Sequence, residues 1–416
     1  MKILLENALV LKDAFSEPKM AKVLIENGKI TELGDFVEEV VDERYDLSGK
    51  LIIPGLINSH THAAMTLMRG IAEDMYLHDW LFKRIFPIED RLNPEDVYYG
   101  TMLSQMEMAR KGIVGYVDMY FHCDAVAQAA LDFGMKALVT RGLTDANGFE
   151  AGKLRLQQNI DYFQRWHGKE GLILVGFGPH APYSCSTAYI DHIAKTAYEL
   201  GATITIHLYE SKEEKYSLKE LLKTKLSECK VIFAHCVHIN KQDIKLLSSE
   251  NFFVAHNPTS NLKLANGIAP IRQMLKENIR VCLGTDGAAS NNTLDIWHEM
   301  RLATLLQKKD DPVNMNVEEA LTMATINGAK ASGLTTGTIE IGSDADLVVL
   351  DIEKPWYLPE QYLKSHLVHS VNSLDVFATM IKGRWVYFDN NFPTINESQI
   401  RSKFKEVIKK LIDTKN

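Results

Sequence analysis

The chain reads Pro54-Gly55-Leu56-Ile57-Asn58-Ser59-His60-Thr61-His62 at the end of an apolar run that begins at Leu51. A short apolar run bounded by polar residues predicts a buried β-strand over residues 51–59. In an extended chain the side chains at positions i and i+2 share one face, so both histidines are expected to point the same way. Taken alone the pair is weak, because roughly 0.5 His-x-His pairs per chain arise by chance at this histidine content.

Seven further short apolar runs follow, and helical patterns separate them. The additional strands are predicted at 114–119, 136–141, 172–178, 203–206, 231–234, 252–255 and 280–284, and helices at 94–111, 188–200, 241–248 and 293–307. Eight strands that alternate with helices predict a parallel (β/α)₈ TIM barrel, an α/β fold. The active site of such a barrel lies at the C-terminal ends of its strands.

Polar residues fall at the ends of five of these strands. His180 ends the fourth strand, His207 the fifth, His235 the sixth, His256 the seventh and Asp286 the eighth. Any one histidine there is as consistent with a hydrogen-bonded core residue as with a functional one. The set on one rim favours a site, because catalytic residues of this fold come from several strand ends.

Imidazoles and a carboxylate are ligands that suit zinc. Three histidines and one aspartate leave a position for a water molecule, whose pKa the metal lowers toward neutrality. Glu210 lies three residues beyond His207, where a carboxylate can move protons without being a ligand. The alternative for Glu210 is a solvated charge within a polar stretch.

The two ends of the chain read as β structure. Asn27-Gly28 lies between two short apolar runs and predicts a tight hairpin, because a type I′ turn needs positive φ at both positions. We therefore expect residues 1–53 and 334–390 to form one small composite β-sandwich domain beside a barrel of residues 54–333. Apolar residues at helical spacing predict a docked C-terminal helix within 391–416.

The composition of the 416 residues is that of a globular protein with a net charge of −8. That charge gives no attraction for a polyanion, so we expect a small-molecule ligand and no nucleic acid. The sequence has no apolar run of about twenty residues and no signal-peptide core, and its five cysteines form no CxxC pair. These observations predict a cytoplasmic protein with no membrane contact. We also expect a homo-oligomer, because large barrel proteins commonly form symmetric assemblies.

Longer motifs around the strand ends resemble the amidohydrolase superfamily, in particular its branch of 5′-methylthioadenosine/S-adenosylhomocysteine deaminases. The resemblance covers nearly the whole chain. The motifs that carry it are Pro54 to His62, Gly178-Pro179-His180-Ala181-Pro182-Tyr183, Phe233-Ala234-His235-Cys236-Val237-His238, Ala255 to Leu264, and Gly284 to Asn292.

This resemblance implies that one divalent metal, usually zinc, is held by four residues: His60, His62, His207 and Asp286. It implies that Glu210 donates a proton to purine N1 and that His235 and Asp286 orient the attacking hydroxide. It further implies that Glu89 binds the ribose hydroxyls and that Trp80 packs against the sugar and its 5′ group. Arg141 and His180 are expected to line the substrate site.

The resemblance also bears on metal number and on the substrate tail. Binuclear members carry a carboxylated lysine at the end of the fourth strand, where this chain has His180, so a single metal is expected. Tyr209 stands where the branch more often has a small residue, and we expect it to reshape the purine pocket. After Arg141, only Lys153 and Arg155 are available to meet a homocysteine carboxylate.

The predicted reaction is hydrolytic deamination of the adenine ring of a 5′-modified adenosine, such as methylthioadenosine, S-adenosylhomocysteine, 5′-deoxyadenosine or adenosine. One alternative is a deaminase or chlorohydrolase of the same superfamily that acts on guanine, a triazine or another cyclic amidine. A second alternative is a metal-free barrel that serves as a structural or interaction module.

Overall fold

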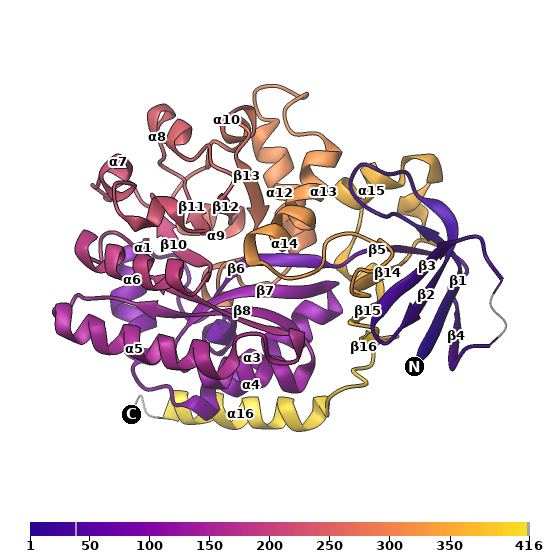
Figure 1. Ribbon diagram of the computed structural model, residues 1–416, viewed down its shortest axis with the longest axis horizontal. Coiled ribbons are helices and arrows are strands. Elements are labelled where there is room, and N and C mark those ends of the chain that lie inside the picture. Colours follow the sequence, from indigo (N-terminus) through magenta and orange to yellow (C-terminus); the bar gives the residue numbers. More distant parts are fainter. Residues whose placement is uncertain (38–39, 414–416) are drawn as a thin grey trace.

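The computed structural model describes residues 1–37 and 40–413. In this part of the chain the strands form two sheets, a barrel of parallel strands and a mixed sheet built from both chain ends, which lie side by side in Figure 1. The predicted fold class is confirmed. The domain bounds 1–53, 54–333, 334–390 and 391–416 stay predictions, and residues 38–39 and 414–416 of them lie outside the described residues.

The barrel strands follow one another in chain order around the sheet, each parallel to the next. They are β6 (Leu56–Thr61), β7 (Ile113–Tyr120), β8 (Lys136–Leu143), β9 (Ile173–Pro179), β10 (Ile204–Leu208), β11 (Val231–His235), β12 (Phe252–His256) and β13 (Arg280–Leu283). Most of their residues are buried, as expected for strands covered on both faces. The backbone N–H of Asp286, just beyond β13, donates to the carbonyl of His60 at 3.0 Å and so links the last strand to the first.

Helices and short helical turns connect the barrel strands. The main helices are α3 (Pro94–Arg110), α4 (Cys123–Phe133), α5 (Phe149–Trp166), α6 (Thr187–Glu199), α7 (Leu218–Leu221), α8 (Lys241–Leu246), α9 (Pro258–Lys263), α10 (Ile271–Lys276), α11 (Ala288–Asn291), α12 (Ile296–Gln307), α13 (Val317–Ala324) and α14 (Ile326–Ser332). Between β6 and α3 the chain forms η1 (Ala63–Met68), α1 (Leu77–Trp80), the π-helical turn η2 (Leu81–Ile85) and α2 (Phe86–Glu89). Single 3₁₀ turns are η3 (Lys169–Gly171) and η4 (Lys225–Glu228).

The mixed sheet joins the two ends of the chain in the order β16-β15-β14-β5-β1-β2-β3, with β4 also paired to β1. Its strands are β1 (Lys2–Val10), β2 (Lys19–Glu26), β3 (Lys29–Gly34), β4 (Glu43–Asp46), β5 (Lys50–Pro54), β14 (Leu347–Asp351), β15 (Val376–Ile381) and β16 (Arg384–Phe388). Asn27 and Gly28, with φ of +50° and +81°, connect β2 to β3, so the predicted hairpin turn is confirmed.

The predicted strand over residues 51–59 is in fact two strands that belong to different sheets. β5 pairs with β14 and β1 in the mixed sheet, whereas β6 pairs with β7 in the barrel. Gly55 alone separates them, and a Cβ there would lie only 2.3 Å from the side chain of Val114. The side chain of Val114 thus fills the space that a side chain at this junction would need.

A buried charge cluster lies where the mixed sheet meets the N-terminal end of β8. The Lys136 ammonium is fully buried and donates to Asp344 at 2.7 Å, to Asp346 at 2.5 Å and to the Thr335 carbonyl at 2.9 Å. The second oxygen of Asp346 accepts from the backbone N–H of Lys382 at 2.8 Å. This cation therefore ties the barrel to the mixed sheet with its partners in place.

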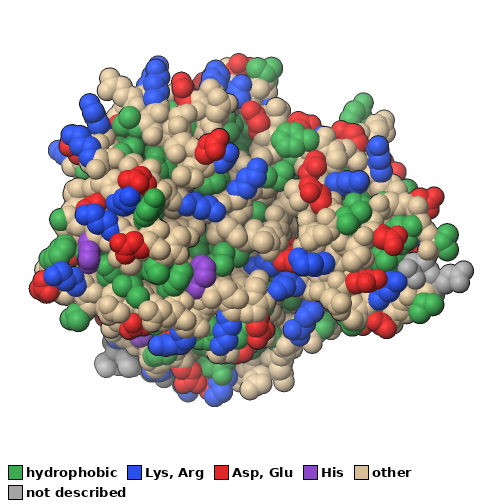
Figure 2. Space-filling model, in the orientation of Figure 1, with side chains coloured by type: hydrophobic (Ala, Val, Ile, Leu, Met, Phe, Trp, Pro, Cys, Tyr) green, Lys and Arg blue, Asp and Glu red, His purple; other side chains and the backbone are tan. Residues whose placement is uncertain are grey.

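After β14 the chain passes through η5 (Pro355–Tyr357), η6 (Glu360–Tyr362), α15 (Leu363–His369) and η7 (Ser373–Asp375), and it ends in α16 (Glu397–Asp413). α16 runs along the outside of the barrel beside α3 (Figure 1) and buries Ile400, Val407 and Leu411. No helix in the described ranges is both long and apolar enough to cross a membrane. Basic and acidic side chains are intermingled on the face shown in Figure 2.

Candidate active site

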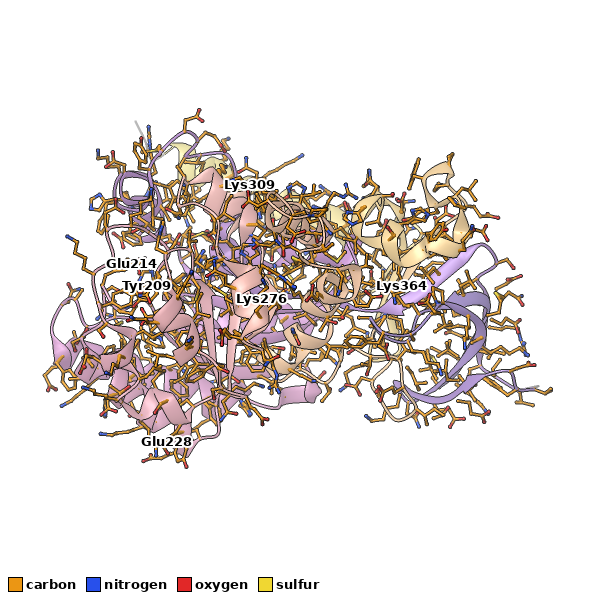
Figure 3. The ribbon with its side chains drawn as sticks, turned by 90° about the horizontal axis from the view of Figure 1, so that it is seen from above. Tyr209, Glu214, Glu228, Lys276, Lys309 and Lys364 are labelled. Atoms are coloured by element: carbon orange, nitrogen blue, oxygen red, sulfur yellow. The ribbon has the colours of Figure 1, made fainter. Side chains whose placement is uncertain are left out.

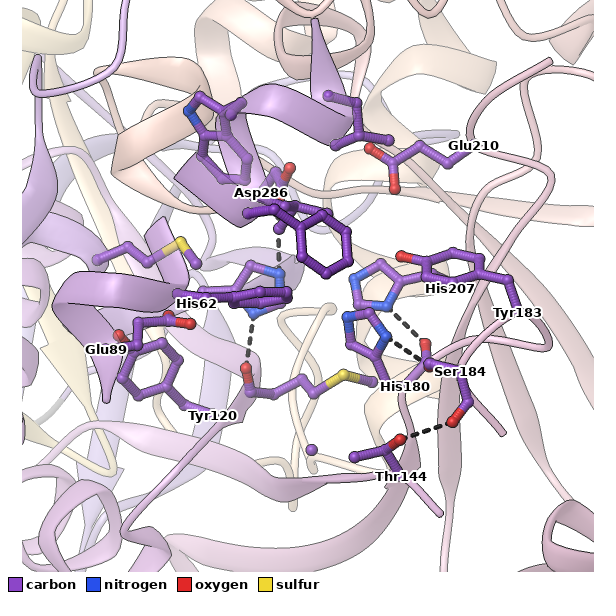
Figure 4. A pocket seen from close by; sticks show the side chains of 18 of the residues that line it. His62, Glu89, Tyr120, Thr144, His180, Tyr183, Ser184, His207, Glu210 and Asp286 are labelled. Carbon is purple, nitrogen blue, oxygen red and sulfur yellow. Dashed lines mark hydrogen bonds and ion pairs between the residues drawn. The ribbon is translucent and has the colours of Figure 1, made fainter. Parts of the chain in front are cut away.

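A cavity of about 380 Å³ opens at the C-terminal ends of the barrel strands, the end at which the fold predicts a site. Its polar wall contains histidines and acids from several strand ends and from α2: His62, Glu89, His180, His207, Glu210, His235 and Asp286. All of these except His235 are labelled in Figure 4. The rest of the wall is largely apolar: Met65, Leu77, Trp80, Leu81, Phe82, Phe86, Met119, Tyr120, Phe121 and Leu264.

The four predicted metal ligands meet at the floor of this cavity. The Nε2 atoms of His62 and His60 lie 3.2 Å and 3.7 Å from Oδ1 of Asp286. The ring of His207 lies 4.9 Å from that of His60 and 5.5 Å from that of His62, measured between centroids. The side chains are therefore close enough to share one ion, and His235 lies in the same group.

Hydrogen bonds fix the orientation of these rings. Nδ1 of His62 lies 2.6 Å from the carbonyl of Met119, and Nδ1 of His207 lies 2.7 Å from the carbonyl of His180. A carbonyl can only accept, so Nδ1 carries a proton in each ring, and Nε2 is the nitrogen left to bind a metal. This is how metal-binding histidines are usually oriented.

Asp286 is oriented in the same way. The hydroxyls of Ser260 and Ser290 donate to Oδ2 at 2.7 Å and 2.8 Å, which leaves Oδ1 facing the histidines. Although burial opposes it, the neighbouring His62 lowers the pKa of Asp286, so this group is a carboxylate.

The donor set fits a divalent cation. Both ring nitrogens of His60 are buried and have no hydrogen-bond partner among the described residues, a cost that a ligand bond removes. Burial lowers the pKa of His60 and of His207, which keeps both rings in the neutral form that binds metal. Asp286 acts against burial and raises the pKa of His62 to about 9, so metal binding there would displace a proton.

The backbone is strained where it presents these side chains. Tyr209, His235 and Asp286, at or just after the ends of β10, β11 and β13, have φ of +51°, +73° and +59°. Such left-handed residues cost about 1–3 kcal/mol each and are concentrated at functional sites. The turns end each strand abruptly and direct the next side chains across the barrel mouth.

Glu210 lies at the edge of the ligand cluster with only 5% of its surface exposed. One carboxyl oxygen, Oε2, is 3.8 Å from Nε2 of His235, and the other, Oε1, accepts from the amide of Asn266 at 3.1 Å. Burial raises the pKa of Glu210 to about 7. A carboxyl group with this pKa can both give and accept a proton near neutral pH. The alternative of a solvated charge is therefore wrong.

Three further predicted substrate contacts also line the cavity. His180 presents its ring there, with Nδ1 held 2.8 Å from the Ser184 hydroxyl, and burial lowers its pKa to about 4. Trp80 and Glu89 come from α1 and α2, and each has a buried polar atom with no partner among the described residues. Burial raises the pKa of Glu89 to about 7. Polar atoms of this kind are ready to bond a ligand.

The candidate cations lie outside the cavity wall. Gly142 and Thr144 line the cavity, whereas Arg141 does not, because alternate residues of a strand face opposite sides. Lys153 pairs with Glu150 at 2.8 Å, and Arg155 donates to the carbonyl of Thr144 at 3.0 Å. Among the described residues that line the cavity, none is a lysine or an arginine.

Tyr209 also turns away from the cavity, contrary to the expectation that it reshapes the purine pocket. Its ring stacks on Tyr216 at 4.8 Å, and its hydroxyl donates to Asp243 at 2.9 Å. Tyr209 and Glu214 lie together at one side of the barrel in Figure 3. Glu214 accepts from the backbone N–H groups of Glu210 and Ser211 at 2.8 Å and 2.9 Å, so this loop supports Glu210 from behind.

Several residues of the site had no predicted role. Ser260, Asn261 and Asn266 contact Asp286, His235 and Glu210, respectively. The motif from Ala255 to Leu264 was the only sequence signal for Ser260 and Asn261, and it ends before Asn266. His256, by contrast, ends β12 without lining the cavity, and both of its buried ring nitrogens are without a partner in the described structure.

Comparisons with known proteins agree with this geometry. A model of the amidohydrolase family matches residues 51–386. The chain is 50% identical over 409 residues to a 5-methylthioadenosine/S-adenosylhomocysteine deaminase from Thermotoga maritima, covering 98% of this chain and 99% of that one. It is 37% identical over 433 residues to a 5′-deoxyadenosine deaminase from Methanosarcina acetivorans, covering 100% and 99%. Among solved structures, a zinc-bound adenosine deaminase from Xanthomonas campestris has a TM-score of 0.91 at 27% identity, covering 99% and 98%.

Proposed function

This chain belongs to the amidohydrolase family, and we propose that it is a metal-dependent aminohydrolase that removes the 6-amino group from 5′-modified adenosines. The observation that carries the proposal is the position of Glu210, a buried carboxyl group with a pKa near 7 beside four potential metal ligands. The deaminase names of its relatives at 50% and 37% identity support the adenosine substrate.

We propose that His60, His62, His207 and Asp286 hold one divalent cation and that this cation is zinc. The set of three imidazoles and one carboxylate and the unpartnered nitrogens of His60 support this assignment. His180 stands where a bridging lysine would support a second ion. When bound, such a cation acts as a Lewis acid that makes water acidic enough to attack at neutral pH.

The proton transfers fall to Glu210 and His235 in this proposal. Protonated Glu210 gives its proton to purine N1, which draws electron density from C6 and prepares that carbon for attack. Asp286 and His235 orient the attacking water. As the C–O bond forms at C6, the water gives one proton to His235. The new hydroxyl group gives its second proton to Glu210, which passes it to the departing nitrogen, so that the C–N bond breaks and ammonia leaves. The proton on His235 then restores protonated Glu210.

The nucleoside end of the substrate would bind in the apolar part of the cavity. There Glu89 would accept hydrogen bonds from the ribose hydroxyls and Trp80 would pack against the sugar and its 5′ group. His180 lies nearer the cluster and would contact the nucleoside from the opposite wall. The predicted contact to Arg141 has the least support, since this residue does not line the cavity.

Ammonia release from pure protein tests the reaction. We expect hydrolysis of 5′-methylthioadenosine, 5′-deoxyadenosine, adenosine and S-adenosylhomocysteine, with much slower release from adenine, guanine and aminotriazines. If the activity on free bases equals that on nucleosides, the alternative substrates, guanine, a triazine or another cyclic amidine, would be favoured. Elemental analysis should give one zinc per chain, and near-zero metal in active protein would refute the proposed ligand set.

We also propose that the enzyme acts in the cytoplasm as a homo-oligomer. All five cysteines are buried and unpaired, which is typical of proteins in a reducing compartment. Cell fractionation and light scattering on the purified protein test these two points.

A further inference from the structure

One short segment contacts three active-site residues that come from three different strands. This segment, residues 257–267, contains α9 and the turn that follows it. Ser260 donates to Asp286, Asn261 accepts from Nδ1 of His235 at 2.9 Å, and Asn266 donates to Glu210. The segment therefore sets the relative positions of groups that no single strand could align.

The turn after α9 determines where the Asn266 side chain lies. The backbone N–H groups of Asn266 and Gly267 both donate to the carbonyl of Asn261, at 2.8 Å and 3.2 Å. Ala265 and Gly267 have φ of +57° and +118°, so the chain reverses tightly there. Asn266 is 6% exposed, and its amide is directed at Oε1 of Glu210 from a rigid turn.

The direction of this hydrogen bond has a chemical consequence. An amide N–H can only donate, so Oε1 of Glu210 must accept whether the group is a carboxylate or a carboxylic acid. When Glu210 is protonated, the proton is then carried by the other oxygen, Oε2. That oxygen is the one that lies 3.8 Å from His235, toward the ligand cluster.

We infer that Asn266 is a positioning residue, which holds the Glu210 carboxyl group so that its acidic proton stands on the oxygen facing the purine ring. The inference rests on the proposed deaminase function. It goes beyond that function, because it assigns a role to a residue that itself touches neither substrate nor metal. Without the amide, the carboxyl group can turn and its proton can stand on either oxygen.

Two substrates separate this role from a merely structural one. Hydrolysis of a 6-amino nucleoside breaks a C–N bond and needs protons for N1 and for the departing amine. Hydrolysis of the matching 6-chloropurine nucleoside forms the same C–O bond and breaks a C–Cl bond, and chloride leaves with the electron pair and without a proton. Both reactions use the proton at N1, but only the amine also needs a proton from Glu210 on its leaving group. Poor proton delivery should therefore slow the amine more than the chloride.

The test compares Asn266→Asp and Asn266→Ala with the parent enzyme on 5′-deoxyadenosine and its 6-chloro analogue. A misplacement of about 1 Å can cost a factor of about 100. We expect kcat for the amine to fall by about 10- to 100-fold with KM within about twofold, and kcat for the chloride to fall by a factor that is smaller by about threefold or more. Asn266→Gln, which keeps a donor, should retain more amine activity than Asn266→Ala.

Asn316→Ala is the matched control, because it removes an exposed capping hydrogen bond to Glu319 at the start of α13, and Asn316 does not line the cavity. It should leave the ratio of the two rates unchanged. Equal losses on both substrates in the Asn266 variants, or no loss on either, would overturn the inference while the parent remains a deaminase. If the aspartate variant does not fold, the glutamine and alanine variants decide. A parent enzyme inactive on every adenosine would instead refute the proposed function.

Discussion

The two ends of the barrel both bury charge, but they treat it differently. At the N-terminal end, Lys136 is fully buried and meets two carboxylates and a carbonyl. At the C-terminal end, His60, Glu89 and Trp80 each bury polar atoms that have no partner in the described residues. The buried lysine at one end has its partners within the chain, whereas the unpartnered polar atoms at the other end are arranged for something that comes from outside it.

This difference shows which end of the barrel stabilises the fold and which end gives up stability for a binding site. An unpartnered buried polar group costs about 1–3 kcal/mol, and each left-handed residue at the strand ends adds a similar cost. Native proteins are stable by only about 5–15 kcal/mol, so these costs are not incidental. The C-terminal end is destabilised in return for a preformed site, whereas the N-terminal end fastens the barrel to the mixed sheet.

The largest expected effect comes from Glu210→Gln, which should lower kcat/KM by about 10²- to 10⁴-fold, the usual contribution of general acid–base catalysis. Folding should respond in the opposite sense. Burial raises the pKa of Glu210 from 4.5 to about 7, so its share of the stability is present below pH 4.5 and lost as pH rises through about 7. Metal-free Glu210→Gln should therefore melt at the same or a higher temperature than the parent at pH 8. A clear fall in its melting temperature would contradict the contrast between the two ends.

Lys136→Met, at the opposite end of the barrel, should lower the stability of the protein and leave its activity nearly unchanged. It leaves Asp344 and Asp346 buried without their cation, and breaking such a buried pair costs about 3–5 kcal/mol. Denaturant unfolding measures this loss, and kcat of the folded fraction should stay near the parent value.

Two variants make that experiment specific. Lys153→Met removes an exposed pair and should cost no more than about 1 kcal/mol. Adding Asp344→Asn and Asp346→Asn to Lys136→Met should restore much of the lost stability. A stable Lys136→Met protein would show that the buried cluster does not fasten the two sheets.

The substrate tail gives a smaller effect. Because no described lining residue is a lysine or an arginine, a homocysteine carboxylate finds no cation in the cavity. We expect kcat/KM for 5′-methylthioadenosine to exceed that for S-adenosylhomocysteine by about tenfold, and Ala146→Arg, on the cavity wall, to narrow the gap, since a hydrogen bond to a charged group contributes about 1.5–3 kcal/mol. Steady-state kinetics with both substrates test this preference. A higher kcat/KM of the parent enzyme for S-adenosylhomocysteine than for 5′-methylthioadenosine would refute the prediction.

The smallest effect concerns the two cations beyond Arg141. Lys153 and Arg155 are engaged with Glu150 and with the Thr144 carbonyl. Alanine at either position should change the ratio of kcat/KM for the two substrates by less than about twofold, as expected for groups that make no substrate contact. A selective loss for S-adenosylhomocysteine would show that one of them reaches the substrate.

The sequence was sufficient to predict the barrel and the rim. Short apolar runs that end in histidine or aspartate place those side chains at one end of a parallel barrel, because the geometry of the fold brings all strand ends together. Asn27-Gly28 predicted its hairpin for a similarly local reason. Local patterns, and a resemblance carried by motifs at strand ends, thus lead to residues that the structure brings together in one cluster.

The rest depends on contacts between distant segments. Residues 51–59 read as one strand, and only pairing with β14 and β7 shows that Gly55 divides them between two sheets. The two carboxylate partners of Lys136 lie more than 200 residues away, and the contact from Asn266 to Glu210 spans 56 residues. Tyr209 was misplaced because its positive φ and its stacking on Tyr216 are properties of a folded loop.

Half of the apolar residues on the cavity wall come from a different part of the chain than the polar cluster. Leu77, Trp80, Leu81, Phe82 and Phe86 all come from one stretch between β6 and α3, whereas the histidines and Asp286 of the cluster come from several strand ends. Residues in that stretch can therefore change without loss of the hydrolytic reaction. Such changes would alter which 5′ group the cavity accepts. Substitutions within about ten consecutive residues are therefore enough to change the substrate range of homologous enzymes.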